Sequence, residues 1–163
     1  MEFKGHPAVE ELSTLLRGES PRCAVIVAAA YFDETLAGLL VDTRNRSFYA
    51  RIDDALEWGL LTPNEHADLH VLRELRNGFA HDLRIKDFDL SSGARAASLA
   101  TWRVASAARS LERVLQTPLG QLLFVVGVIA FRLHKRNKPT EKSGPLPEPP
   151  MTDFASWPPV TSI

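Results

Sequence analysis

The residues best suited to chemistry lie in one stretch, Leu69 to His81, which reads LHVLRELRNGFAH. On a helix of ~100° per residue its apolar side chains collect on one face, and a polar strip forms roughly opposite to them. The strip consists of His70, Arg73, Asn77 and His81. Imidazole titrates near neutral pH, which suits proton transfer. This stretch is therefore the first candidate for a functional site.

Arg76 falls on the flank of the apolar face of the same stretch. A guanidinium in that position is expected to reach a carboxylate, because it needs bidentate partners once water is excluded. Asp33 and Glu34 interrupt an otherwise apolar helix and need partners if they are buried. We therefore predict a structural ion pair among Asp33, Glu34, Arg51 and Arg76, with either arginine as the cation.

His66 and His70 have the i, i+4 spacing of a helical metal pair. Ala67, however, stands where a zinc protease with this spacing carries its glutamate, and the sequence shows no third ligand. A solvated helix face accounts for both histidines. The chain also has no glycine-rich phosphate loop, so we expect neither a metal nor a cofactor.

The 163 residues of the chain suffice for one domain with a real core. The formal net charge is -1, so no global positive field attracts nucleic acid. Cys23 is the only cysteine, which excludes an internal disulfide and fits a reducing compartment. The first six residues contain no apolar signal core. We expect a cytoplasmic protein.

Helical periodicity and capping signals recur along the chain, and no span shows convincing strand alternation. Ser20, Thr62 and Thr117 each precede a proline, which is typical of a helix start. Glu65 completes a capping box with Thr62. We predict an all-α fold, an antiparallel bundle of about six helices over residues 7–17, 21–41, 48–58, 63–81, 91–115 and 118–135.

The composition changes sharply after the last predicted helix. Seven of the eleven prolines follow Asn137, so we assign residues 1–136 to a helical domain and 137–163 to a Pro-rich disordered tail. The apolar run Leu119–Leu133 covers only ~15 residues, against the ~20 that a bilayer needs. We interpret it as a buried core helix. A membrane-associated adaptor is the third functional alternative.

Three stretches, in this order and spacing, resemble the mannitol operon repressor (MltR) family: AAAYFDETL (28–36), SFYARI (47–52) and the run from Leu60 to His81. The resemblance covers roughly residues 8 to 135 and implies an all-helical regulator that represses genes of mannitol uptake and utilisation. No short turn leads into a basic recognition helix, so we do not expect direct DNA binding. We therefore expect a non-enzymatic regulator of this type that acts through a protein partner, and we also expect a self-associating face that forms a homodimer.

The ending Arg76-Asn77-Gly-Phe-Ala-His81 is also similar to the Arg-Asn-x-x-x-His pattern of the HEPN superfamily. That superfamily includes helical, metal-independent ribonucleases whose arginine and histidine usually act at a dimer interface. The resemblance implies that His81 is a general acid/base, that Arg76 stabilises the phosphorane, and that Asn77 orients phosphate. Ribonuclease activity on RNA is the alternative function. In the structural alternative Arg76 pairs with Asp33 or Glu34, Asn77 caps backbone groups and His81 closes the helix.

Overall fold

The computed structural model describes residues 6–41, 45–108 and 116–149. These residues form seven α-helices and no strand, which confirms the predicted all-α fold. The helices are α1 (Pro7–Leu16), α2 (Pro21–Leu39), α3 (Phe48–Glu57), α4 (Pro63–His81), α5 (Leu90–Ala97), α6 (Ala100–Ala108) and α7 (Pro118–His134).

The predicted helix starts at Ser20, Thr62 and Thr117 are confirmed. Each of these side chains accepts a hydrogen bond from the backbone N–H three residues further on, and each is followed by proline at the first helical position. At Thr62 the Glu65 carboxylate also accepts from the Thr62 N–H, so the predicted capping box is complete. Local side-chain chemistry therefore sets the starts of α2, α4 and α7.

The prediction of a single helix over residues 91–115 is wrong. Two helices, α5 and α6, occupy this stretch as far as Ala108, and residues 109–115 lie outside the described residues. Asp89 caps α5. The chain then turns, because Asp68 of α4 accepts hydrogen bonds from the N–H groups of Ala100 (2.5 Å) and the next residue (2.9 Å). A buried carboxylate from another helix thus starts α6.

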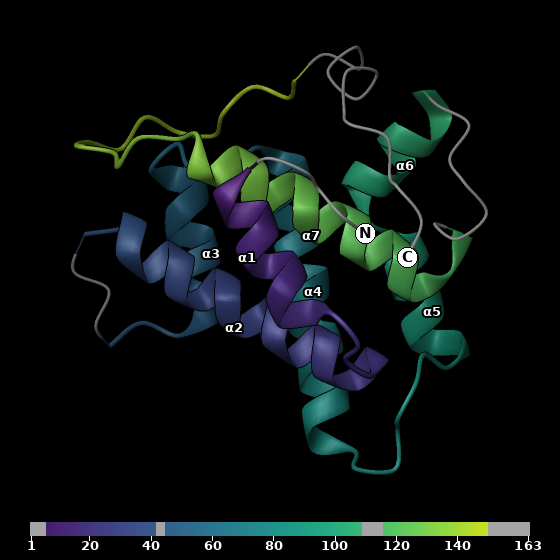
Figure 1. Cartoon of the computed structure of the whole chain (residues 1–163). Coiled ribbons are helices and arrows are strands. Elements are labelled where there is room, and N and C mark those ends of the chain that lie inside the picture. The colour runs from purple at the N-terminus through teal and green to yellow at the C-terminus, as the bar shows by residue number, and fades with distance from the viewer. Residues whose placement is uncertain (1–5, 42–44, 109–115, 150–163) are drawn as a thin grey trace.

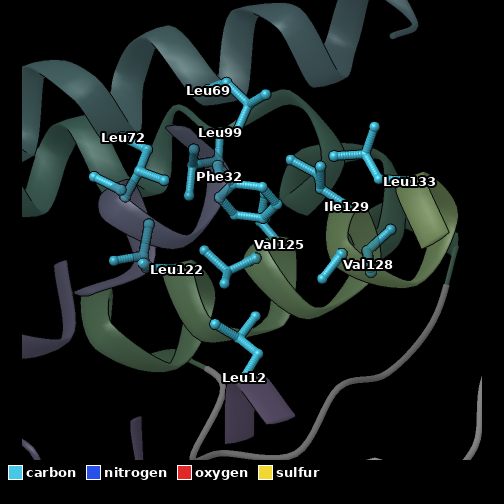
Figure 2. Close-up of a cluster of buried hydrophobic side chains, with 14 of the residues drawn as sticks. Leu12, Phe32, Leu69, Leu72, Leu99, Leu122, Val125, Val128, Ile129 and Leu133 are labelled. Carbon is cyan, nitrogen blue, oxygen red and sulfur yellow. The ribbon is translucent and has the colours of Figure 1, made fainter. Parts of the chain in front are cut away.

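The core lies where α4 and α7 meet the helices around them. The α4 helix packs against α2, α3, α5 and α6, while α7 packs against α1, α2, α5 and α6 (Figure 1). Figure 2 shows the interior that results, with Phe32 of α2 surrounded by aliphatic side chains from several helices. The labelled residues of this cluster are Leu12, Phe32, Leu69, Leu72, Leu99, Leu122, Val125, Val128, Ile129 and Leu133.

The apolar α7 helix is a core helix, as predicted. Most of its side chains are buried among the other helices, which accounts for its hydrophobicity. In the part of the chain that the structure describes, no helix combines the length and the apolarity needed to cross a membrane.

The described part of the predicted tail, residues 137–149, is irregular in backbone and lies on the α3–α4 corner (Figure 1). The N–H groups of Gly144 and Leu146 donate to the carbonyls of Glu57 and Leu61, at 2.9 and 3.0 Å. The Glu148 carboxylate accepts from the N–H of the second residue of α4 at 2.6 Å. These hydrogen bonds attach the start of the Pro-rich segment to the helical domain. Residues 150–163 lie outside the described residues.

Candidate functional site

The RNGFAH motif occupies the last six residues of α4. Arg76 and His81 are exposed, and Asn77 is partly buried. The Arg76 guanidinium donates a hydrogen bond to Asn77 Oδ1 at 3.0 Å. At 3.6 residues per turn, Arg76 and His81 leave the helix ~140° apart, whereas Asn77 and His81 share a face. The structure therefore joins Arg76 to Asn77, but α4 does not direct Arg76 and His81 to one point.

Of the two predicted cations, Arg51 pairs with Asp33, which confirms that alternative, whereas the predicted pairing of Arg76 with Asp33 or Glu34 is wrong. Asp33 Oδ1 pairs with Arg51 Nη1 of α3 at 2.5 Å, and Glu34 is exposed. Asp33 itself is only half-buried, with 37% of its side chain exposed, so it is not the buried acid that the sequence suggested. The orientation of the helices about their axes explains this result. Asp33 of α2 faces α3, whereas Arg76 lies next to the buried Leu75 but on the solvent-exposed side of α4.

The fully buried carboxylate of the described residues is Glu65, which the sequence indicated only as a helix cap. Its side chain is 0% exposed. Arg136 Nη1 and Nη2 lie 2.6 and 2.9 Å from its two oxygens, and Arg132 Nη1 lies 3.3 Å away. Arg132 of α7 and Arg136, which follows the end of α7, thus neutralise one acid in the first turn of α4 and fix the two helices to each other.

Asp68 is the second buried acid of α4, 2% exposed as a residue. Burial disfavours its charged form and raises the pKa of the carboxyl from 3.8 to about 6, against the opposing effect of hydrogen bonds from Thr101 and Ala100. Because Asp68 starts α6, its role is structural.

The structure brings a carboxylate, Asp53 of α3, to the His66–His70 pair, for which the sequence showed no third candidate ligand. Asp53 of α3 places Oδ1 2.8 Å from His66 Nε2 and 3.0 Å from His70 Nε2. The two Nε2 atoms are 3.2 Å apart. Burial disfavours the charged Asp53 carboxyl, but hydrogen bonds and charges from both rings outweigh burial and hold its pKa below the ordinary 3.8. Asp53 is therefore ionised at neutral pH. The sequence showed no third candidate ligand because Asp53 belongs to a different helix from the two histidines.

A cavity of about 440 Å³ lies between α4 and the segment that leads into α5, beside the RNGFAH motif. Arg73 and Asn77 from the polar strip line it together with Ser92 and Arg95 of α5, and Phe79 forms part of its wall. Arg95 is engaged by Glu74 at 2.5 Å. Asn77 thus borders a solvent-accessible hollow, whereas Arg76 and His81 are not among its lining residues.

Comparisons of the chain with known protein families, with curated proteins and with solved structures find no match. The likeness to the MltR and HEPN families therefore rests on the motifs themselves. In space these motifs are adjacent, because α2, α3 and α4 carry them and pack against one another.

Proposed function

We propose that the chain is a non-enzymatic regulator of the MltR type, a transcriptional co-regulator that acts through contacts with another protein. The adjacency of the three MltR-like stretches carries this proposal. Residues 28–36, 47–52 and 60–81 lie on helices that pack together, and the Asp33–Arg51 ion pair joins the first two stretches. The three stretches, each of which resembles the MltR family on its own, thus lie side by side in the structure. This arrangement is expected if they were inherited together as parts of one MltR-like domain.

The end of α4 is the surface that we assign to the partner. Arg76 and His81 are exposed there, and Asn77 orients the Arg76 guanidinium. A fixed guanidinium and an imidazole suit recognition of acidic or polar groups on a protein. The net charge of -1 provides no general attraction for DNA.

Genetic complementation in the native host tests this proposal. The gene is deleted, and transcript levels are compared after complementation with wild type or with the charge-reversal variant Arg76→Glu/His81→Glu. A matched control, Arg103→Glu/His134→Glu, changes the same residue types at exposed positions of α6 and α7. The wild type and the control should restore the transcript profile and co-purify the same partner, and the α4 variant should do neither.

Two results would contradict the regulator. Deletion that leaves every transcript unchanged would remove the regulatory role. Specific binding of operator DNA by the purified chain alone would show that it reads DNA without a protein partner.

A HEPN-type ribonuclease is the second candidate, and the exposure of Arg76 and His81 favours it. Neither side chain is used in a buried ion pair of the described residues, so both are available to RNA. Because they leave α4 ~140° apart, we place the catalytic site at a dimer interface, with Arg76 from one copy and His81 from another. His81 would act as general acid/base and Arg76 would stabilise the phosphorane charge.

RNA cleavage in EDTA separates this candidate from the regulator. His81→Ala should abolish cleavage, whereas His134→Ala, which removes the exposed histidine that ends α7, should not. Arg76→Ala and His81→Ala should each be inactive alone. Mixed one to one, they should regain about one quarter of wild-type activity, since half of randomly exchanged dimers contain one intact site of two. No cleavage by wild type beside an active control nuclease removes the ribonuclease reading.

A further inference from the structure

We propose that Asp53, His66 and His70 form a binding site for a divalent transition-metal ion, for which Zn²⁺ is the probe. Two imidazole nitrogens and a carboxylate oxygen are a ligand set that zinc and related ions bind in proteins. The site is independent of the proposed regulatory function, and neither proposal needs the other.

The spacing of the three ligand atoms matches one face of a coordination polyhedron. Their separations are 2.8, 3.0 and 3.2 Å. For metal–ligand bonds of ~2.1 Å, neighbouring ligand atoms lie about 3.0–3.4 Å apart in octahedral and tetrahedral sites. An ion placed over the triangle reaches all three atoms after shifts of a few tenths of an ångström.

No protonation state makes all three contacts hydrogen bonds at the same time. A neutral imidazole has one N–H. If both Nε2 atoms carry the proton, both donate to Asp53 Oδ1, and the two nitrogens then lie 3.2 Å apart with no hydrogen bond between them. If either Nε2 lacks the proton, it presents a lone pair to the carboxylate. A cation would engage all three atoms at once, because it accepts lone pairs from both nitrogens and from the carboxylate.

The two helices hold the ligands in place. His66 and His70 are one turn apart on α4, and Asp53 lies on α3, which packs against α4. The Tyr49 ring lies against the His70 ring, with centroids 4.9 Å apart. The neighbouring Asp54 is engaged by Arg46 at 3.0 Å and is not part of the set.

The cluster is also accessible to an ion from solvent. The side chains of His66, His70 and Asp53 are 24%, 18% and 39% exposed. Three protein ligands with an open side leave a coordination position for water or for a group from a partner. Once bound, the ion connects α3 to α4 and stabilises the folded state over the unfolded chain.

Calorimetric titration of the untagged full chain with Zn²⁺, after treatment with a chelator, tests the site. Wild type should bind one ion per chain with a micromolar or tighter Kd, and its melting temperature should rise with added zinc. Asp53→Asn, His66→Gln and His70→Gln should each weaken binding by at least about tenfold. Asp54→Asn and His134→Gln, which change a neighbouring carboxylate and a remote exposed histidine, should bind as wild type does.

X-ray absorption of the zinc-loaded protein should show only nitrogen and oxygen ligands, at about 2.0–2.2 Å. This readout excludes the exposed Cys23 thiol as the binding group, and Cys23→Ser should bind normally. Circular dichroism checks that each variant is folded. If a histidine variant does not fold, Asp53→Asn tests the site in its place. No binding by wild type, equal binding by folded Asp53→Asn, or a sulfur ligand overturns the proposal.

Discussion

The buried acid Glu65 offers the sharpest test of how the helices are held together. The variant Glu65→Gln keeps the shape of the side chain and its capping-box hydrogen bond with Thr62, because glutamine also serves in capping boxes. It removes the negative charge that faces Arg136 at 2.6 Å and Arg132 at 3.3 Å. The variant thus isolates the charge from the cap.

The expected loss of stability is large. Removing one partner of a buried ion pair costs ~3–5 kcal/mol, because the remaining charge is left in a low-dielectric environment. Arg136 is only 17% exposed, so water compensates little, although its Nη1 also donates to the Leu60 carbonyl. We therefore expect about 3 kcal/mol, out of a total stability of ~5–15 kcal/mol for a domain. For a chain of this length the melting temperature should fall by about 6–12 °C.

Urea unfolding followed by far-ultraviolet circular dichroism and tryptophan fluorescence measures the effect, provided that the slope with urea is unchanged. The matched control is Glu57→Gln, which removes the same charge from an exposed pair with Lys142. That pair is worth ~0–1 kcal/mol. If Glu65→Gln and Glu57→Gln unfold within about 0.5 kcal/mol of each other, the buried charge pair does not stabilise the fold and the reasoning fails.

Three further predictions follow from single contacts. The pKa of Asp68 is raised to about 6 in the folded state, so the folded protein binds this proton more tightly than the unfolded chain does. The contribution of Asp68 to stability is therefore highest below about pH 3.8 and is lost as the pH rises through 6. The unfolding free energy of wild type relative to Asp68→Asn should fall by up to about 3 kcal/mol between about pH 4 and 7, and a rise would show that the fold prefers the carboxylate. Arg76→Ala should change stability by less than about 0.5 kcal/mol, since Arg76 is exposed, and a loss above 2 °C in melting temperature would reveal a structural contact. Gly59→Ala should lower the free energy of unfolding in urea by at least about 1 kcal/mol, because φ is +68° and the new Cβ would lie 2.0 Å from Ser143 Oγ. The control Gly38→Ala, in α2, should not destabilise the fold, because its new Cβ would have no neighbouring atom within 4 Å.

The sequence determined the class of fold and the positions where several helices begin. A capping residue acts on backbone groups only three positions away, so its effect does not depend on the rest of the fold. For this reason Ser20, Thr62 and Thr117 were identified correctly. The same local reasoning failed at residues 98–99, where a carboxylate from α4 starts the next helix and nothing in the neighbouring sequence shows it.

Only the tertiary structure decided which charged and polar groups meet. The tertiary structure also decided which apolar residues are buried. Leu83 continues the apolar spacing of α4, but the helix ends at His81 and Leu83 is 74% exposed. The prediction that Arg76 is a buried cation was wrong for a similar reason. A helical projection shows that Arg76 flanks the apolar face, but it does not show which helix, if any, packs against that flank. The signal that was available for Glu65 lay in the buried Leu60 and Leu61 just before its cap, which draw the start of α4 into the core.

The Asp53–His66–His70 cluster was likewise only partly predictable from the sequence. The i, i+4 spacing of His66 and His70 was readable, because one helix fixes it. The third member, Asp53, lies 13 residues before His66 and belongs to another helix. The turn at Gly59, with φ of +68°, reverses the chain so that α3 packs against α4. Periodicity describes one helix at a time, whereas a site between two helices depends on their rotation and register, which packing of the whole core sets.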